Sequence, residues 1–210
     1  AMPTESVRIR LAEGLFALLK RKTLKHISVR DITTECGLTR QVFYRYFHTR
    51  DDLLRWIYGQ DFAAVFQDLK HVAWEEMIDR MTLALQAHRE FYYRLTRCAD
   101  DNTLYRIMRD YTEGLYRRVI LFRTGKAPEP FTDFLLRLYT SGGIEMSIEW
   151  VRSGMEKPPL ELRSWLLAGM PEPLREQLTG FSFPASLIYD PELLGGEPPR
   201  ATGKLLGAEG

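Results

Sequence analysis

The sequence predicts an all-α protein in which a small N-terminal domain precedes a larger helical body. Two Ser/Thr-x-x-Asp signatures, at Ser28 and Thr49, indicate helix starts, because the hydroxyl and the carboxylate satisfy free amides of the first turn. After residue 55, apolar residues recur at helical spacing in nearly every segment, and no sustained strand-like alternation or repeat interrupts them. We therefore expect three regions, at residues 1–50, 51–179 and 180–210.

Residues 28–54 predict two short helices, a tight turn between them and the start of a long third helix. The first covers 29–36 and ends there because Gly37 can adopt the left-handed conformation that closes a helix. Thr39 then caps the second, whose pattern RQVFYRYF over 40–47 separates apolar side chains from basic, amide and phenol groups. A short helix that is held by a partner helix and presents donors is the arrangement that reads the major groove of DNA.

Three segments of the N-terminal region resemble the tetracycline-repressor (TetR) family of transcriptional regulators. They are LAEGLFALLKRK, an amphipathic helix with a basic end, ISVRDITTECGLTRQVFYRYF, a helix-turn-helix closing on an aromatic string, and HTRDDLL, with its basic residue. The resemblance is specific as far as residue 60 and looser beyond. It implies a three-helix DNA-binding domain with a helix-turn-helix and a larger α-helical domain for ligand binding and dimerisation. Arg40-Gln41 stand where the family often has Lys-Gly, and Arg50 where it often has Lys, which indicates a different operator.

We predict two kinds of DNA contact within this region. Arg40 can donate two hydrogen bonds to a guanine edge and Gln41 can pair with an adenine, which makes them the main candidates for base readout. Tyr44 is a further candidate for base readout, and Arg45 suits either kind of contact. The predicted phosphate contacts, which set the register on DNA, are Ser28, Thr39, Tyr46 and Arg50. The alternative is that residues 40–47 are only an aromatic helix of the core with solvated charges. The glycine turn and the helix caps around this segment favour the DNA-binding interpretation.

The charge distribution divides the chain in a similar place. Residues 1–60 carry 11 Lys and Arg against 6 Asp and Glu, a net charge of +5, although the whole chain has a net charge of only +1. The remaining residues therefore carry a net charge of −4. A basic region attracts the phosphate backbone, and its DNA affinity should fall with salt, whereas an acidic body needs a different partner.

Several functional classes find no support in the residues. No run of apolar residues is long enough to cross a bilayer and no leader precedes the first helix, so we expect a cytoplasmic protein without membrane contact. Cys36 and Cys98 lack metal-ligand spacing and are expected to be reduced thiols. No Glu-x-x-His pairs, glycine-rich phosphate loop or nucleophile elbow occur, so we expect no catalytic residues, cofactor or bound metal.

The segment 131–155 is the most apolar predicted helix, and its apolar residues do not fit on one face, which indicates cover on several sides. With the following segment, 159–179, it resembles the penultimate and final helices that form the TetR dimer interface. A twofold dimer would read a palindrome with two recognition helices. The predicted homodimer contacts are Phe131, Leu135, Leu138, Gly142, Trp150, Leu162 and Leu166.

The resemblance also implies a cavity among the middle helices, where a small molecule would shift the spacing of the two DNA-binding domains. Its predicted lining residues are Trp74, Met77, Met81, His88, Tyr92, Tyr93, Met108, Tyr111 and Trp150. This aromatic, methionine-rich set would suit an apolar or planar effector, but such residues at helical spacing are also what a plain core requires. The predicted function is a regulator, expected to be a repressor, that a small molecule releases from double-stranded operator DNA. The alternative is a ligand-independent regulator controlled by a protein partner.

The C-terminal region 180–210 departs from the usual ending of the family. It holds 6 glycines and 4 prolines in 31 residues, too many for a helix, yet it begins with the apolar string FSFPASLIYD. We expect it to dock on the protein's own surface or on its dimer mate, and a lid over the cavity is the alternative. The predicted anchors are Phe181, Phe183, Leu187, Ile188 and Tyr189.

Overall fold

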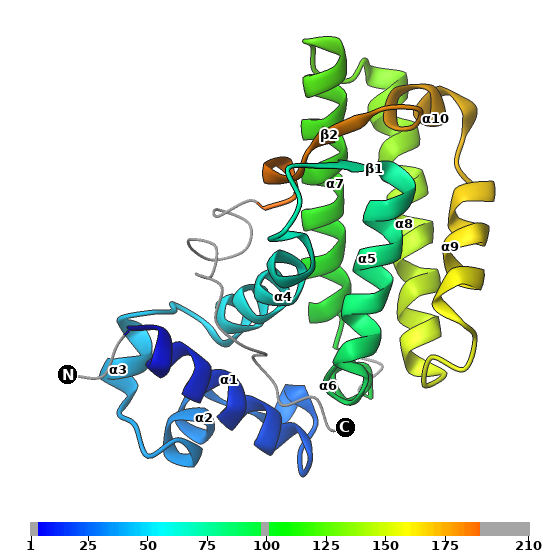
Figure 1. The fold of residues 1–210 in the computed structure, drawn as a ribbon. Coiled ribbons are helices and arrows are strands. Elements are labelled where there is room, and N and C mark those ends of the chain that lie inside the picture. Colours follow the sequence, from blue (N-terminus) through cyan, green and yellow to red (C-terminus); the bar gives the residue numbers. More distant parts are fainter. Residues whose placement is uncertain (1–3, 98–100, 190–210) are drawn as a thin grey trace.

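The computed structural model describes residues 4–97 and 101–189, and within these ranges the chain is almost entirely helical (Figure 1). Three short helices, α1 to α3, form a small unit that we call the head, and helices α5 to α10 form a larger unit that we call the body. Helix α4 runs between them. The predicted all-α fold class is confirmed. Cys98 and residues 190–210 lie outside the described residues.

The head consists of α1 (Thr4–Leu19), the short 3-10 turn η1 (Leu24–His26), α2 (Val29–Glu35) and α3 (Arg40–Tyr44). Gly37 closes α2 at a φ of +62°, and the amide of Leu38 returns to the carbonyl of Thr33 at 2.8 Å, which satisfies an end carbonyl of the helix. Helices α1 and α2 approach closely, since a Cβ added at Gly14 would lie 2.2 Å from the sulfur of Cys36. Cys36 is a free thiol that donates to the carbonyl of Arg10 at 3.0 Å, and burial raises its pKa.

Helix α3 is shorter than the predicted stretch 40–47, because regular α-helix ends at Tyr44 and the chain turns at the two residues that follow. The predicted separation of apolar from polar side chains is nevertheless correct, since Phe43 and Phe47 are both buried. The Phe47 ring packs against Trp56 of α4, with 6.0 Å between the ring centres. The recognition helix is thereby attached to the helix that leads into the body.

Helix α4 (Arg50–Phe66) begins with the second predicted capping box, in which Thr49 and Asp52 exchange hydrogen bonds. It ends at Phe66, and the chain then turns and becomes extended at residues 71–73. Ten of its 17 residues are buried, since the head covers one part of the helix and α5 and α7 cover another. A helix that is buried all round cannot shift without moving its neighbours.

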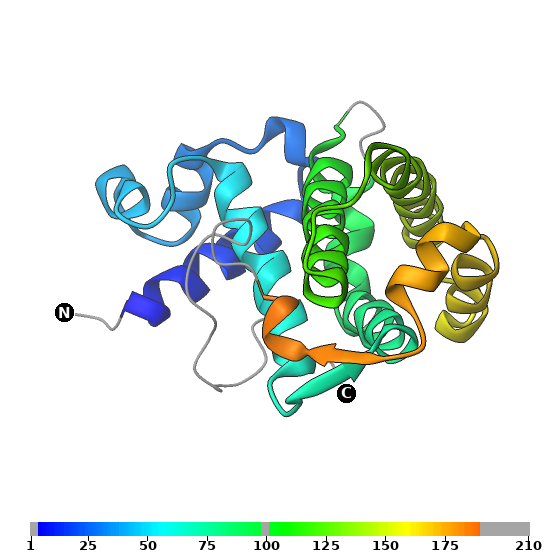
Figure 2. The same ribbon diagram turned by 90° about the horizontal axis from the view of Figure 1, so that it is seen from above.

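The body helices run side by side, with α5, α7, α8 and α9 forming the bundle and α10 crossing the end that lies away from the head (Figures 1 and 2). Their bounds are α5 (Trp74–Ala87), α6 (Arg89–Leu95), α7 (Thr103–Thr124), α8 (Pro130–Arg152), α9 (Pro159–Ala168) and α10 (Glu172–Leu178). The expected single helix at 159–179 is therefore two helices, separated at Gly169–Pro171, where a proline cannot continue the preceding helix. None of the helices that the structure describes has the length and apolar character that crossing a bilayer requires.

A two-stranded antiparallel sheet was not expected from the sequence. Strand β1 (His71–Ala73) pairs with β2 (Ser182–Pro184), with Val72 opposite Phe183. Each strand has only three residues, which is too short for an alternating pattern to be recognised. The pairing depends on contact between segments more than one hundred residues apart in the sequence, which no local pattern reports.

Residues 181–188, which we call the strap, dock on the body of their own chain (Figure 2). Phe183 is fully buried beside Trp74, with 6.2 Å between their rings. The hydroxyl of Tyr111 donates to the Ile188 carbonyl at 2.7 Å, and Arg118 donates to the Leu187 carbonyl at 2.9 Å. The strap therefore joins α7 to the extended segment between α4 and α5, and the predicted docking on the chain's own surface is confirmed for this part of the tail.

Two contacts join the head directly to α6. Arg94 donates to the carbonyls of Leu19 and Lys20, both at 3.3 Å, at the C-terminal end of α1, where free carbonyls favour a cation. Phe16 of α1 meets Phe91 of α6 edge-on at 5.8 Å. The head is thus held by the start of α4 and by α6 together.

A buried carboxylate links α4 to the junction of α5 and α6. Asp61 accepts a hydrogen bond of 2.5 Å from the Tyr92 hydroxyl, and the His88 ring lies 3.5 Å from its second oxygen. Burial raises the pKa of Asp61 to about 7, and the hydrogen bond from Tyr92 acts in the opposite direction. The Asp61 carboxyl of the folded protein therefore stays protonated over a pH range in which the same carboxyl of the unfolded chain is ionised.

Replacing Phe183 by alanine should lower the free energy of unfolding by about 3 to 5 kcal/mol, because it leaves a cavity beneath the strap. Urea denaturation followed by circular dichroism measures the effect. Phe122→Ala is the matched control, since Phe122 is 50% exposed on α7 and its loss creates no internal cavity. Equal stabilities of the two variants would contradict the structural role of the strap.

The stability contributed by Asp61 should fall as the pH rises from about 4 to about 7, because the raised pKa means that the folded state binds the proton more tightly than the unfolded chain does. Asp61→Asn keeps an acceptor for Tyr92 without the charge. We expect it to flatten the pH dependence and to be more stable than the parent above about pH 7, by about 1.4 kcal/mol for each unit of pKa difference removed. Urea denaturation across this pH range is the measurement. The exposed Asp68→Asn should reproduce the parent's curve, and a parallel curve for Asp61→Asn would refute the assignment.

Candidate functional site

Helix α3 presents its polar residues to solvent and its aromatic core residues to the head. Arg40, Gln41 and Arg45 are exposed, and the Tyr44 side chain is 52% exposed although it lies next to the fully buried Phe43. An exposed tyrosine ring and two exposed arginines on one short helix offer both donors and stacking area to a groove. All four residues predicted to read or approach bases are therefore accessible.

Ser28 and Thr39, two of the predicted phosphate contacts, are helix caps. The Thr39 hydroxyl accepts from the Val42 amide at 3.3 Å, and the Ser28 hydroxyl accepts from the Asp31 amide at 3.1 Å. The Ser28 hydroxyl also donates to the Asp31 carboxylate at 2.6 Å, and these bonds hold the pKa of Asp31 well below its usual range. Both hydroxyls are exposed, so each orients the start of a helix at the surface.

The other two predicted phosphate contacts are more enclosed. Tyr46 is half-buried, with the Arg8 guanidinium 5.8 Å from its ring centre. Arg50 donates to the carbonyls of Leu24 and Ile27 and lies 3.3 Å from Asp51, so its guanidinium fastens η1 to the start of α4. This structural role of Arg50 depends on a turn that the sequence pattern did not reveal.

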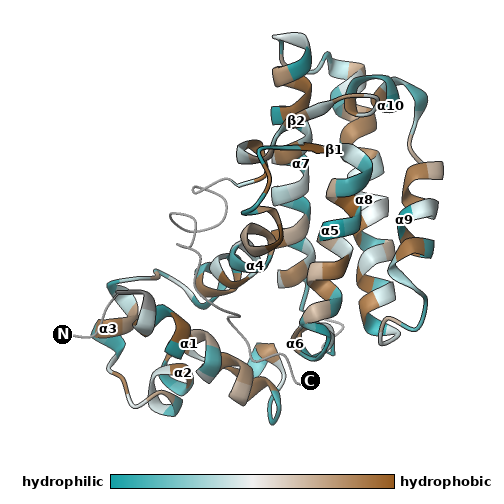
Figure 3. Ribbon diagram, in the orientation of Figure 1, coloured by the Kyte–Doolittle hydropathy of each residue, from teal (hydrophilic) through white to brown (hydrophobic). Residues whose placement is uncertain are grey.

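Helices α8 and α9 leave a large apolar surface uncovered, which we call the outer face. On α8, Phe131, Phe134 and Leu138 are 66%, 52% and 59% exposed at spacings of three and four residues. On α9, Leu160 and Trp165 are 60% and 53% exposed. Figure 3 shows apolar stretches along α9 at the outer edge of the body. An exposed apolar surface of this kind is typical of an interface.

The predicted dimer contacts divide between this face and the interior. Phe131, Leu138 and Gly142 are exposed, and nothing lies within 4 Å of a Cβ placed at Gly142, so a second backbone could approach there. Trp150 and Leu162 are buried within the chain, and the Trp150 ring nitrogen donates to the Lys157 carbonyl at 2.8 Å. Leu135 and Leu166 are half-buried. Sequence reasoning missed Phe134, Met146, Leu160 and Trp165, because spacing alone does not tell which apolar side of a helix is left open.

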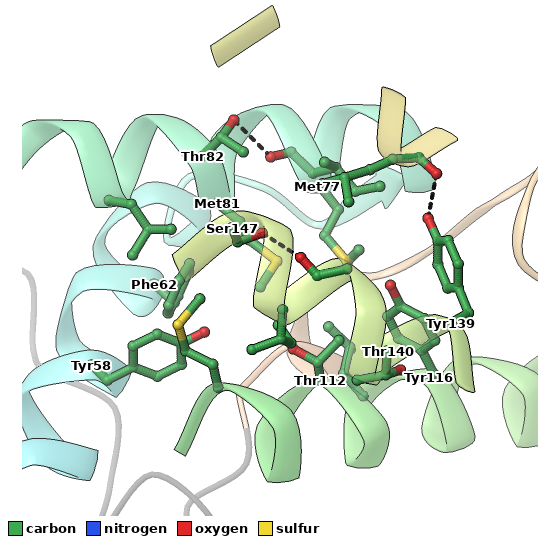
Figure 4. Close-up of a pocket in the computed structure, with 17 residues that line it drawn as sticks. Tyr58, Phe62, Met77, Met81, Thr82, Thr112, Tyr116, Tyr139, Thr140 and Ser147 are labelled. Carbon is green, nitrogen blue, oxygen red and sulfur yellow. Dashed lines mark hydrogen bonds between the residues drawn. The ribbon is translucent and has the colours of Figure 1, made fainter. Parts of the chain in front are cut away.

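A cavity of about 70 Å³ lies among α4, α5, α7 and α8. In Figure 4, Tyr58 and Phe62 of α4 close one end, α5 and α7 form opposite walls, and Tyr139 stands at the other end. The full set of lining residues is Tyr58, Phe62, Met77, Ile78, Met81, Thr82, Leu85, Met108, Thr112, Leu115, Tyr116, Tyr139, Thr140, Gly143, Ile144, Ser147 and Leu166. No residue of the strap lines it, so the alternative that this segment forms a lid has no support in the described residues.

Three of the predicted pocket residues, Met77, Met81 and Met108, line this cavity. Five others do not. The Trp74 ring packs on Tyr116 with 4.6 Å between ring centres, Tyr111 holds the strap, Tyr92 and His88 surround Asp61, and Trp150 faces α9. Tyr93 is also absent from the lining and is 38% exposed. The sequence pattern found the methionines but did not single out the small hydroxyl residues on α7 and α8.

The described residues offer an exposed basic surface on α3 and an uncharged cavity in the body. Among the residues that the structure describes, no group of three or more His, Cys, Asp or Glu side chains could hold a metal ion. Burial raises the pKa of Tyr58 and Tyr116, and burial raises the pKa of Tyr139 to about 12, so all three phenols stay protonated at neutral pH.

Comparison with known proteins shows similarity to a curated relative and to a solved structure. The relative, the HTH-type dhaKLM operon transcriptional activator DhaS of Lactococcus lactis, is 29% identical over 86 residues, which is 40% of this chain and 46% of that protein. The alignment thus spans less than half of the relative's length. The solved structure, described as the dihydroxyacetone kinase operon activator DhaS, is 22% identical and has a TM-score of 0.53, covering 78% of this chain and 96% of the other. At this identity the likeness concerns the fold.

Two family models match successive parts of the chain. The model described as bacterial regulatory proteins, tetR family, matches residues 13–57, which contain the C-terminal part of α1, the helix-turn-helix and the first part of α4. The model described as transcriptional regulator C-terminal region, which belongs to the same family, matches residues 73–164, from α5 into α9. These two matches agree with the resemblance of the helix-turn-helix motif to the TetR family and with the observed fold. The chain therefore belongs to the TetR family of bacterial transcriptional regulators.

Proposed function

We propose that this regulator binds a palindromic operator as a homodimer and is released from it when a small molecule enters the body cavity. The observation that carries the DNA-binding part is the exposed face of α3, which presents Arg40, Gln41 and Tyr44 on a helix fixed by Phe43 and Phe47. The net charge of +5 over residues 1–60 supports attraction to the phosphate backbone.

The outer face of α8 and α9 supports the homodimer. Its exposed phenylalanine, leucine and tryptophan side chains would be costly to leave in water, and a second copy would cover them with the same surface. A twofold dimer would present two α3 helices to half-sites about one helical turn apart.

The position of the cavity supports ligand control. Tyr58 and Phe62 line it from α4, and α4 also carries the head through the contact of Trp56 with Phe47. A ligand that binds the two arrangements of α4 with different affinity shifts the population of DNA-competent dimers by that difference. The sign of regulation that we propose is repression, and the related DhaS, which is named as an activator, makes a reporter assay the necessary check.

Selection of DNA from a random pool by the full chain tests the proposal. The expected result is an enriched sequence with inverted symmetry, whose affinity falls steeply with salt. Placing that sequence before or over a promoter with a reporter gene then distinguishes repression from activation. Failure to enrich any sequence would overturn the proposed function.

Arg40→Ala should flatten the base preference at one position of each half-site and weaken binding by about 1 to 3 kcal/mol, because a bidentate contact to a base is lost. Fluorescence anisotropy with the selected operator and its single-base variants measures both effects. Arg109→Ala removes the same charge from the body and should change neither. Arg50 is a weaker test residue, because it also holds η1 in place. An unchanged base preference in Arg40→Ala would contradict the readout assignment.

Leu138→Asp should shift the protein from dimer to monomer and abolish high-affinity operator binding, because it places a charge in the outer face. Sedimentation velocity gives the oligomeric state. Leu83→Asp is the matched control, since Leu83 is 52% exposed on α5. A charge at Leu166 is less suitable, because this side chain lines the cavity. A stable dimer of Leu138→Asp would place the interface elsewhere.

A further inference from the structure

The lining of the body cavity is mostly apolar but includes several hydroxyl groups. Seven of its lining residues carry hydroxyl groups, and among the described residues no charged side chain lines it. The hydroxyl residues are Tyr58, Thr82, Thr112, Tyr116, Tyr139, Thr140 and Ser147. The raised pKa of Tyr58, Tyr116 and Tyr139 keeps their phenols neutral. A charged ligand would therefore lose its hydration without meeting an opposite charge.

Three of these hydroxyls bond back to the protein. Thr82 donates to the Ile78 carbonyl at 3.0 Å, Ser147 to the Gly143 carbonyl at 2.8 Å, and Tyr139 to the Leu166 carbonyl at 2.6 Å (Figure 4). Such bonds satisfy these donors within the protein, so these groups do not require a ligand.

Thr140 is different. Its side chain is 2% exposed, it lines the cavity from the middle of α8, and its hydroxyl oxygen has no hydrogen-bond partner in the structure. Leaving a buried hydroxyl unpaired costs about 1 to 3 kcal/mol, so the group is poised for a partner from the cavity. Thr112 and Tyr116, one turn apart on α7, also line the cavity and lie on the same side of it as Thr140 in Figure 4.

The size of the cavity limits the ligand. A cavity of about 150 Å³ admits benzene, which has six non-hydrogen atoms, and this one measures about 70 Å³, so it suits a molecule of about three or four non-hydrogen atoms with slight adjustment of its methionines. Met77, Met81 and Met108 form apolar parts of the wall, so they favour a ligand whose carbon skeleton is apolar.

We propose that the effector is a small uncharged molecule with a hydroxyl or carbonyl oxygen, and that Thr140 is the residue that recognises this oxygen. The assignment rests on the proposed function, since it names the ligand class of the same regulatory cavity. It narrows the apolar or planar effector that the sequence suggested, because the cavity is small and part of its lining is hydroxyl groups.

A matched set of three-carbon molecules tests the ligand class on protein without DNA. 2-Propanol and acetone carry the oxygen, propane lacks it, and 2-propylamine is charged at neutral pH. With methionine methyl groups labelled with carbon-13, nuclear magnetic resonance titration locates the binding at Met77, Met81 and Met108. We expect the alcohol and the ketone to shift these signals at lower concentration than propane and the amine do.

Thr140→Val tests the residue. It should weaken binding of the alcohol and the ketone about 3- to 10-fold without weakening that of propane, because one hydrogen bond is lost. Its melting temperature should be equal to or above that of the parent, since no internal partner is lost. Thr132→Val is the control, because Thr132 is a buried threonine of α8 that does not line the cavity, and it should leave ligand preference unchanged.

The outcomes separate the two proposals. Equal affinity for propane and 2-propanol, tighter binding of the amine, or an absence of shifts at the three methionines each overturns the ligand class. An unchanged preference in Thr140→Val overturns the assignment of the oxygen contact to Thr140. A lower melting temperature of Thr140→Val would show that the hydroxyl has an internal partner and would overturn its role. None of these results affects the selection of operator DNA, which is measured without ligand and decides the proposed function by itself.

Discussion

The burial of α4 from two sides is the constraint on which the rest of the structure depends. The head packs on this helix through the contact of Phe47 with Trp56, and the body packs on it through α5 and α7. Because ten of its 17 residues are buried, a change in the body cannot be absorbed locally and must move the helix as a unit. The strap and the Arg94 contact to the end of α1 hold the neighbouring segments in place, so the head has a defined position on the body.

The interior of the body is a closely packed apolar core that contains a few buried polar groups. Asp61 is a carboxylate buried beside Tyr92 and His88, and Thr140 is a hydroxyl without an internal partner. Both groups lower stability relative to an apolar core, and both lie in or beside the elements that connect cavity and head. Natural proteins tolerate such local costs mainly where function requires them. The proposed ligand contact and the pH dependence of stability follow from these two sites.

The head was largely predictable because its signals are local. The capping boxes at Ser28 and Thr49, the left-handed Gly37 and the inward Phe43 each depend on neighbours within four residues, and the structure has all of them. The body was predictable only as a set of helices. Whether Met77 lines a cavity, whether Trp150 faces a partner or its own α9, and whether Leu138 remains exposed depend on how the helices are rotated against one another. Helical spacing marks an apolar side without telling what covers it.

The sequence by itself determined the all-α class, the helix-turn-helix with its exposed Arg40 and Gln41, and the basic character of the head, because caps, turns and charge are properties of short segments. Only the tertiary structure decided the β1–β2 pairing, the role of Arg50 in holding η1, the burial of Asp61 and the unpartnered hydroxyl of Thr140. These features require residues that are distant in the chain to meet, and the free energy of such a meeting comes from packing that no local pattern contains.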